Sequence, residues 1–370
     1  MVTIPFLKKI ALPKFSFRFL AGKPSRVVGV DIGTYSTKVV QLRYERERAI
    51  LETYGELINS GYFKTTNTMR ASGFLRYSDK DIIALLRDVM KEAHVTAKDV
   101  VVAIPSGSSF VTSISLPLMQ RKEMDNAVPY EARKYIPIPI SEVTLDWEVL
   151  ETDTENNVYK ILIAAVPREV IDKFRRVLEA VGLNPRALEI ETFSLIRSLI
   201  GHDPTPTAII NIGYSSIILA VVDRMQLRIS RNFGHGAQEI TRTLERGLGV
   251  TAERAEAMKQ EIGLSQETEN REIASIISPI VEVFLSEIER NIALYNRKAS
   301  RKIQKINLTG GGSNLNGLVA HISSRLGLEV TKGNPFIRII TPAFMQPILR
   351  EIGPSLSVAA GLALREITIR

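Results

Sequence analysis

Two short segments of the sequence combine a carboxylate or amide, a glycine and hydroxyl side chains in the same order. The first reads Val-Gly-Val-Asp-Ile-Gly-Thr-Tyr-Ser and includes Asp31 and Gly33; the second reads Ala-Ile-Ile-Asn-Ile-Gly-Tyr-Ser-Ser and includes Asn211 and Gly213. A glycine lets the backbone approach an anion closely, turn amides donate to phosphate oxygens, and a carboxylate holds hydrated Mg²⁺. The pair therefore predicts a site that grips a polyphosphate from two sides.

A third glycine cluster supports this interpretation over a simpler one. Asp-x-Gly sequences often only close tight hairpins, so one such segment would be weak evidence. Residues 306–314 read Ile-Asn-Leu-Thr-Gly-Gly-Gly-Ser-Asn, a strand that runs into a glycine turn, with a helix expected from about Asn316. Amides at a helix N-terminus suit a phosphate or the face of a nucleoside. The three segments together predict a nucleotide site.

Other common nucleotide and metal sites are excluded by the sequence. Leu315 stands where the last glycine of a dinucleotide-binding GxGxxG motif would be, and no Walker A motif occurs. The chain has no cysteine, which excludes disulfides, thiolate zinc sites and a cysteine nucleophile, and favours the cytoplasm as its compartment. The four histidines lack ligand spacing, so no transition metal is expected.

Hydrophobic periodicity, glycines and prolines predict the elements that must position these turns. The predicted strands are 27–31, 38–44, 49–57, 100–105, 110–116, 143–150, 159–165, 188–190, a meander over 207–233, and 303–308. The predicted helices are 79–93, 122–135, 167–182, 192–200, 237–246, 252–262, 271–297 and 357–366. Each of the two hairpin segments thus opens an antiparallel meander.

The order of these elements predicts two lobes. The chain has 370 residues, of which 45% are hydrophobic, enough for two or more cores. The clearest linker is Gly-His-Asp-Pro-Thr-Pro at 201–206. The expected divisions are a tail at 1–25, the first lobe at 26–98 and 185–206, an inserted unit at 99–184, the second lobe at 207–354 and a closing helix at 355–370.

The tail carries much of the net charge of +8, because the first 26 residues hold six cations and no acid. Apolar residues lie between these cations, as in segments attracted to an anionic membrane surface. A solvated, flexible tail is the equal alternative. The charges also interrupt any signal-peptide core, and no stretch approaches the length of a membrane span.

The motifs resemble those of the actin, heat-shock chaperone and sugar-kinase superfamily. DIGTYSTK at 31–38 is similar to its first phosphate motif, NIGYSS at 211–216 to its second, and LTGGGS at 308–313 to its adenosine motif. Residues 189–195 and 357–364 resemble its two connecting helices. The resemblance covers the chain from Arg26 onward and implies an α/β actin-like (ribonuclease H-like) two-lobed fold with duplicated five-stranded sheets.

Within the superfamily, the sequence is most similar to the FtsA and PilM branch. The unit at 99–184 has the length and order of the subdomain 1C that these proteins insert into the first lobe, and ALEIETFSLIRS at 187–198 is especially similar to the PilM family. This resemblance implies a cytoplasmic ATP-binding adaptor of the type IV pilus platform at the inner membrane. Its partner would be the N-terminal cytoplasmic peptide of PilN, docked near the inserted unit.

The resemblance also implies a role for each site residue, with ATP and Mg²⁺ as cofactors. Asp31 would orient the metal. The residues expected at the phosphates are Gly33, Thr34, Tyr35, Ser36 and Lys38 from the first lobe and Asn211, Gly213, Ser215 and Ser216 from the second. The residues expected at the adenosine are Gly310, Gly311, Gly312 and Ser313, with Glu256 and Lys259 beside the base or ribose. Two alternatives remain open. Lys38 would instead face solvent, and Glu256 with Lys259 would instead form an exposed pair on a helix.

Asn211 departs from the pattern of many hydrolysing members, which have an aspartate there. An amide carries no negative charge and accepts no proton, so metal binding and hydrolysis should be weaker. Glu191 is the remaining candidate for a catalytic role in positioning water or hydrated metal, unless it only caps its helix. The prediction is ATP binding with slow or absent turnover.

Three rival functions are open to experiment. An FtsA-like division protein or filament-forming actin homologue would share the motifs. A metabolic kinase would need a catalytic base, and none is convincing. Non-specific nucleic-acid binding is suggested by the pI near 9.5, but the surplus charge lies in the tail and no specific reading motif occurs. Self-association into a homo-oligomer is left open.

Overall fold

The first lobe is built on a seven-stranded sheet. The computed structural model describes residues 16–18, 24–63, 73–265 and 267–366. The strands of this sheet are β1 Ser16–Arg18, β2 Arg26–Ile32, β3 Ser36–Glu45, β4 Arg48–Ile58, β5 Asp99–Ile104, β9 Asn184–Ile190 and β15 Ile339–Ile340. They lie in the order β1-β9-β5-β2-β3-β4-β15. Strands β2, β3 and β4 form the predicted antiparallel meander, and β5 and β9 run parallel to β2.

The second lobe repeats the central part of this sheet. Its strands are β10 Thr207–Ile212, β11 Ile217–Asp223, β12 Gln226–Phe233, β13 Lys305–Thr309 and β14 Glu329–Lys332, in the order β12-β11-β10-β13-β14. An antiparallel meander followed by two parallel strands is also the order β4-β3-β2-β5-β9 of the first sheet. The predicted duplication of five-stranded sheets is confirmed, and the first sheet gains β1 and β15 at its edges.

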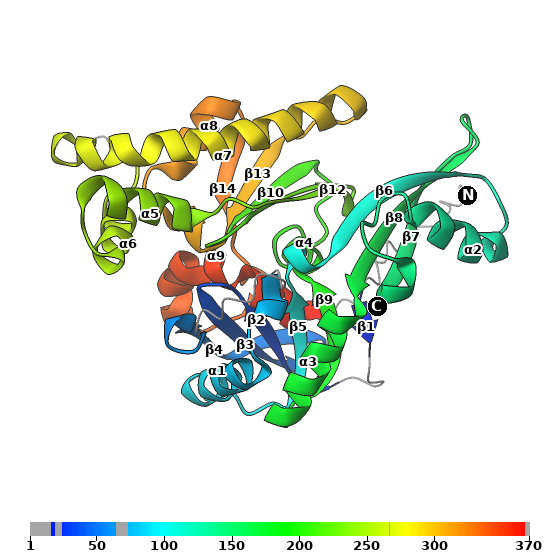
Figure 1. Cartoon of the computed structure of the whole chain (residues 1–370), viewed down its shortest axis with the longest axis horizontal. Helices are drawn as coiled ribbons and strands as arrows, with labels where there is room; N and C mark the ends of the chain where they lie inside the picture. The colour runs from blue at the N-terminus through cyan, green and yellow to red at the C-terminus, as the bar shows by residue number, and fades with distance from the viewer. Residues whose placement is uncertain (1–15, 19–23, 64–72, 266, 367–370) are drawn as a thin grey trace, which may run out of the picture.

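Helices cover the two sheets (Figure 1). Helices α1 Asp79–Glu92 and α3 Arg168–Val181 pack on the first sheet through Ile82, Val89 and Phe174. The second sheet is covered by α5 Ala237–Leu248, α6 Ala252–Glu261, α7 Arg271–Lys298 and α8 Leu318–Leu326. None of the described helices is long and apolar enough to cross a membrane.

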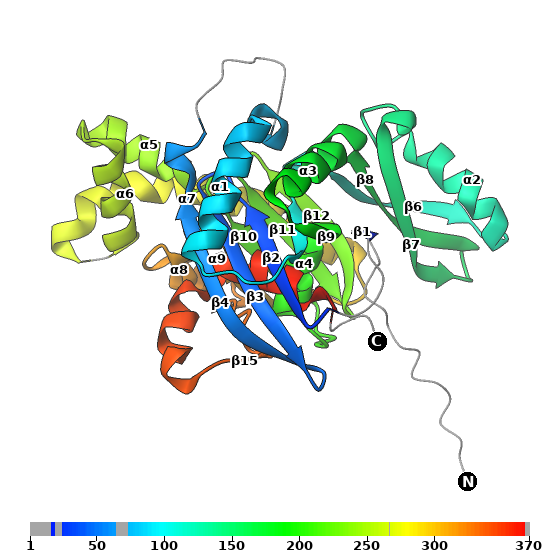
Figure 2. The same ribbon diagram turned by 90° about the horizontal axis from the view of Figure 1, so that it is seen from below.

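A separate small sheet lies within the range expected for the inserted unit. It consists of β6 Phe110–Pro117, β8 Val158–Pro167 and β7 Val143–Asp153 in that order, with α2 Arg121–Ala132 packed on one face. Figure 2 shows it at the side of the molecule. The Arg121 guanidinium lies 4.3 Å from the centre of the Trp147 ring on β7. Strand β5, at the start of the expected range, belongs instead to the seven-stranded sheet.

Two helices, α4 Glu191–Leu199 and α9 Gln346–Ala363, meet behind the first sheet at a very short distance. A Cβ atom added at Gly361 would lie 2.0 Å from the Ser194 carbonyl oxygen, and one at Gly29 of β2 would lie 1.9 Å from the Ala359 carbonyl oxygen. The buried Arg197 guanidinium of α4 donates to both carboxylate oxygens of Glu189 on β9, at 2.7 and 2.8 Å. These contacts fix the position of α4, whose first residue is Glu191.

Three differences from the sequence prediction concern element ends and short strands. Helix α9 begins at Gln346, well before the predicted start at 357. Helix α8 begins at Leu318, after a 3₁₀ turn over Gly311–Asn314, rather than near Asn316. The short strands β1, β14 and β15 were not predicted; β1, within the expected tail, pairs antiparallel with β9. The remainder of the tail and its proposed membrane contact lie outside the described residues, apart from residues 24 and 25.

Candidate functional site

A cavity of about 830 Å³ lies between the lobes and collects the predicted site residues. This volume suits a small-molecule ligand. Its lining includes Asp31, Gly33, Thr34, Tyr35, Ser36, Lys38, Glu191, Asn211, Gly213, Ser215, Ser216, Glu256, Lys259, Gly310, Gly311 and Gly312. Ser313 does not line the cavity; it is buried, and its hydroxyl donates to the Gly310 carbonyl at 2.6 Å. Its predicted position facing an adenosine does not fit this placement.

The two hairpin tips form the same turn. The Gly33 amide donates to the Ser36 carbonyl at 3.1 Å, and the Gly213 amide donates to the Ser216 carbonyl at 2.9 Å. A Cβ atom at Gly33 would lie 2.8 Å from the Ser36 oxygen, and one at Gly213 would lie 2.9 Å from the Ser216 oxygen. Any side chain at either glycine would therefore force the turn open.

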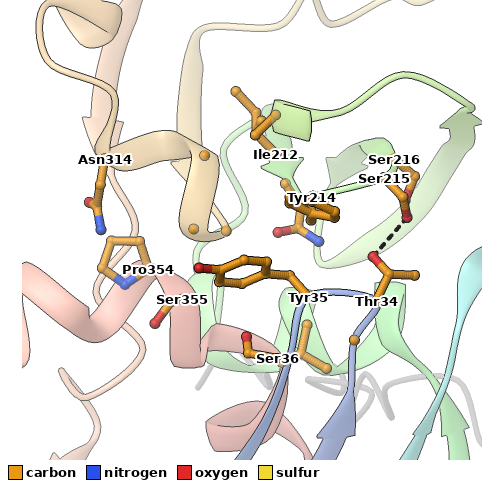
Figure 3. A pocket seen from close by; sticks show the side chains of 18 of the residues that line it. Thr34, Tyr35, Ser36, Ile212, Tyr214, Ser215, Ser216, Asn314, Pro354 and Ser355 are labelled. Atoms are coloured by element: carbon orange, nitrogen blue, oxygen red, sulfur yellow. Dashed lines mark hydrogen bonds between the residues drawn. The ribbon is translucent and has the colours of Figure 1, made fainter. Parts of the chain in front are cut away.

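The tips also touch each other (Figure 3). The hydroxyl oxygens of Thr34 and Ser215 are 2.9 Å apart and share a hydrogen bond. The rings of Tyr35 and Tyr214 lie with centroids 4.9 Å apart and planes tilted by 33°. In each contact, the residue after the glycine of one tip meets the second residue after the glycine of the other. The tips thus contact one another about an approximate two-fold axis.

Two of the carboxyl groups that line the cavity have raised pKa values, Asp31 at the end of β2 and Glu191 at the start of α4. Burial raises the pKa of Asp31, the charge of Lys38 lowers it in part, and Glu56 adds a smaller increase. Burial and the charge of Asp31 raise the pKa of Glu191 to about 7, although the Ser106 amide donates to Glu191 Oε1 at 2.5 Å. Glu191 therefore exchanges a proton near neutral pH.

Lys38 is turned toward the cavity. Its ammonium donates to the Ser36 hydroxyl at 2.8 Å and lies 3.5 Å from Glu56 Oε1, and its side chain is only 13% exposed. The Ser36 hydroxyl in turn donates to Glu56 at 2.5 Å. This placement excludes a solvent-facing lysine and puts a cation beside the first tip.

Glu256 and Lys259 lie on α6 and face Thr241 of α5. The Lys259 ammonium donates to Glu256 Oε2 at 2.6 Å and to the Thr241 hydroxyl at 3.0 Å, and Lys259 is only 6% exposed. Burial favours a raised pKa for Glu256, but the hydrogen bond and charge of Lys259 outweigh it and lower the pKa. Burial lowers the pKa of Lys259, against the opposing effect of Glu256. This buried pair in the cavity wall is not the exposed helical pair considered above.

The glycine loop closes against the second tip. Gly310 has φ +84°, and a Cβ atom there would lie 2.4 Å from both Asn211 Oδ1 and the Ile212 carbonyl oxygen. A Cβ atom at Gly312 would lie 2.4 Å from the Ile212 side chain. Glycines are required here because the two segments pack backbone to backbone.

Sequence reasoning missed several lining residues, including Glu56, Gly107, Ser108 and Lys332. Two signals were available. Glu56 lies opposite Lys38 in the β3–β4 register. The Gly107 and Ser108 turn follows β5, which is parallel to β2, and the carboxyl ends of parallel strands share one edge of a sheet.

The cavity lining carries more carboxylates than lysines, so a polyanion would bind there favourably only together with a divalent cation. Five carboxylates, Asp31, Glu56, Glu191, Glu256 and Glu351, face three lysines, Lys38, Lys259 and Lys332. Across the described ranges, no group of three metal-ligating side chains occurs. Mg²⁺ usually keeps several waters and takes one or two carboxylates plus substrate phosphates, so the expected role of Asp31 as its anchor would not require such a group. The glycine turns fit the phosphates.

Comparisons with known proteins agree with this geometry. The family model described as type IV pilus assembly protein PilM matches residues 29–367. The cell division protein FtsA of Enterococcus hirae is 23% identical over 356 residues, which cover 83% of this chain and 78% of that protein.

Two solved structures share the fold. The PilM–PilN type IV pilus biogenesis complex has a TM-score of 0.80 at 23% identity and covers 94% of this chain and 99% of that one. The MreB5 protein of Spiroplasma citri bound to AMPPNP has a TM-score of 0.51 at 13% identity and covers 94% and 98%. These likenesses confirm the predicted actin-like fold.

Proposed function

Because this chain belongs to the PilM family of type IV pilus assembly proteins, we propose that it is an actin-like adaptor that binds ATP with Mg²⁺ and docks a PilN peptide. Its place would be the inner face of the cytoplasmic membrane. The nucleotide would set the angle between the lobes rather than drive repeated turnover.

The convergence of three glycine segments on one cavity carries the nucleotide part of the proposal. Both hairpin tips and the loop at Gly310 present backbone to the same space, and side chains at these positions would clash. Asp31 would hold hydrated Mg²⁺, while Lys38 and the tip amides would bind phosphate oxygens. The bound cation would supply charge neutralisation for the phosphates.

Slow or absent turnover follows from the polar groups near the phosphate positions. Asn211 lines the cavity where it neither carries charge nor accepts a proton. Glu191 could position a water, but with a pKa of about 7 it is protonated in about half of the molecules at neutral pH. Because a raised pKa makes Glu191 a stronger base than an ordinary carboxylate, the expectation of slow turnover rests on the uncharged Asn211.

The partner part rests on family membership and on the inserted sheet. The solved complex contains PilM together with PilN. The match to this chain covers 99% of the matched chain of that complex, with the same fold. The inserted unit has its own core and a partly exposed outer strand, β7. We place the PilN peptide in a groove beside this unit.

Isothermal titration calorimetry on the full chain tests nucleotide binding. ATP or ADP with Mg²⁺ should bind the unaltered protein, and Asp31→Ala should weaken binding at least about tenfold, since it removes the metal anchor. Asp172→Ala, on the exposed face of α3, is the matched control. Absence of binding by both nucleotides would overturn the proposal. A steady ATPase rate of about one per second, abolished by Asp31→Ala, would contradict slow turnover.

Fluorescence anisotropy tests the adaptor role independently. A labelled synthetic peptide with the N-terminal sequence of the PilN homologue from the same genome should bind, and a scrambled peptide should not. Sedimentation with ATP addresses the FtsA-like alternative. Filaments that pellet without any peptide binding would favour that alternative.

A further inference from the structure

The contacts between the two hairpin tips join opposite lobes of the molecule. Thr34 and Tyr35 belong to the turn between β2 and β3, and Tyr214 and Ser215 belong to the turn between β10 and β11. One hydrogen bond and one aromatic contact connect them. In Figure 3, the Tyr35 ring extends from its tip toward Pro354 and Ser355, with Tyr214 above it. The side chains therefore occupy the space between the tips.

A phosphate held from both sides requires more room than this arrangement leaves. Two donors that bind even one phosphate oxygen, each at about 2.8 Å, are themselves roughly 4–5 Å apart. The Thr34 and Ser215 hydroxyls are separated by 2.9 Å. The hydroxyl contact must therefore break before Thr34 and Ser215 can hold one phosphate oxygen between them.

We propose that Thr34, Tyr35, Tyr214 and Ser215 form an interlobe latch that must open before a polyphosphate can enter between the tips. This inference rests on the proposed nucleotide function and adds a mechanism that controls it. The latch sets the fraction of molecules that are competent to bind. Apparent affinity falls by that fraction, so the latch weakens binding.

Removing a tyrosine of the latch should change nucleotide affinity in the opposite direction to removing a residue that only contacts the ligand. If Tyr35 and Tyr214 only contacted the ligand, their removal would weaken binding. As parts of a latch, Tyr35→Ala and Tyr214→Ala should each tighten ATP-Mg²⁺ binding about two- to tenfold, because one aromatic contact between the lobes is lost while the backbone amides remain. Tyr130→Ala, at a 68% exposed position on α2, is the control. Weaker binding by both variants would overturn the latch.

A disulfide lock tests the same inference directly. The chain has no cysteine, so Thr34→Cys combined with Ser215→Cys introduces the sole thiol pair. Oxidation with copper phenanthroline should link the lobes rapidly, and saturating ATP-Mg²⁺ should slow the linkage. Calorimetry should show at least about tenfold weaker ATP-Mg²⁺ binding by the oxidised form, with recovery after reduction by dithiothreitol.

A second pair within one lobe controls for oxidation itself. Asn307 and Thr331 hydrogen-bond at 2.9 Å on neighbouring strands of the second lobe, so Asn307→Cys with Thr331→Cys should link without changing nucleotide affinity. Equal binding by the oxidised and reduced forms of the tip variant would overturn the latch alone, as would failure of that pair to link. Absence of nucleotide binding by the unaltered protein would overturn the proposed function and the latch with it.

Discussion

At the scale of single residues, the cavity holds two carboxyl groups in different electrostatic surroundings. Burial raises the pKa of both Asp31 and Glu191. The charge of Lys38 lowers both pKa values in part, whereas Glu56 adds to the increase at Asp31 and the charge of Asp31 adds to the increase at Glu191. With a pKa of about 7, Glu191 is suited to exchanging a proton, and the expected role of Asp31 as the anchor for a cation rests on its place at the end of β2, beside the first tip.

The raised pKa of Glu191 predicts how stability depends on pH. The native state holds a proton that the unfolded chain releases above the ordinary pKa of 4.5, so the native protein loses stability as pH rises from about 4.5 through 7. Glu191→Gln removes this loss. Relative to the unaltered protein, its free energy of unfolding should rise by up to roughly 3 kcal/mol between pH 4.5 and 8.

Urea unfolding at pH 5 and pH 8 measures this difference. Glu261→Gln, at an exposed position on α6, is the control and should show no such change. A stability difference for Glu191→Gln that stays constant between the two pH values would show that Glu191 is ionised throughout this range.

The residue types of the site could be predicted from the sequence, but not their burial. Asp31, Gly33 and Gly213 followed from turn chemistry and do line the cavity. Whether Lys259 lies beside the nucleotide or is one half of an exposed helical pair stayed open, because helical spacing alone does not reveal what packs on a helix. Ser313 belongs to the glycine motif, yet its hydroxyl is used inside the turn.

At the scale of elements, the crossing of α4 and α9 connects the site to the core. Gly361 lets α9 approach the backbone of α4 at Ser194. Glu191 is the first residue of α4, and the buried ion pair between Arg197 of α4 and Glu189 of β9 holds the same helix in place. A substitution at the crossing of α4 and α9 would therefore shift the Glu191 carboxyl group in the cavity, although the substituted residue does not contact Glu191.

Gly361→Ala tests this crossing. The added methyl would lie 2.0 Å from the Ser194 carbonyl oxygen, so the helices must separate, and the free energy of unfolding should fall by at least about 2 kcal/mol. Urea unfolding measures the loss. Gly61→Ala, which meets no atom within 4 Å, should change it far less. Equal stability of the two variants would show that the crossing is looser than described.

Elements with a clear period were predicted well, and elements defined by distant contacts were not. The meander strands and α1 with its Ser78 cap follow from local sequence. The early start of α9 was missed, and Gly353 and Pro354, residue types that disfavour a helix, lie inside it. Strand β15 has only two residues and forms by pairing with β4. The local sequence does not reveal this pairing, because the two strands are far apart in the chain.

At the scale of the whole molecule, the lobes are joined by the linker at 201–206 and by the segment between β14 and α9. The linker is tied to the second lobe, because Asp203 Oδ2 accepts from Lys305 Nζ of β13 at 2.5 Å. Within the linker, Asp203 Oδ1 accepts from the Thr205 amide at 2.9 Å. The inserted unit also reaches the second lobe through Glu151, which lies 3.5 Å from Arg228. Any opening of the cleft between the lobes must either keep or break the contacts of Asp203 with Lys305 and of Glu151 with Arg228.

Asp203→Asn tests the anchoring of the linker. The hydrogen bonds from Lys305 and Thr205 lower the pKa of Asp203 to about 2, so its ionised form stabilises the native state above pH 3.8, and this contribution disappears as pH falls toward 2. Because a third of the side chain is exposed, the variant should lose only about 1 kcal/mol at pH 7 and less at pH 3. Urea unfolding at both pH values, with Asp172→Asn as control, measures this; a pH-independent loss would contradict it.

Trp147 gives the inserted unit an optical property that neither lobe has. It is the sole tryptophan of the chain, and the Arg121 guanidinium lies over its ring. Indole emission responds to nearby charge and to water, so tryptophan emission, excited at wavelengths where tyrosine does not absorb, reports on this unit alone. Binding events on the small sheet can therefore be followed in the native protein by its tryptophan emission, without an added dye.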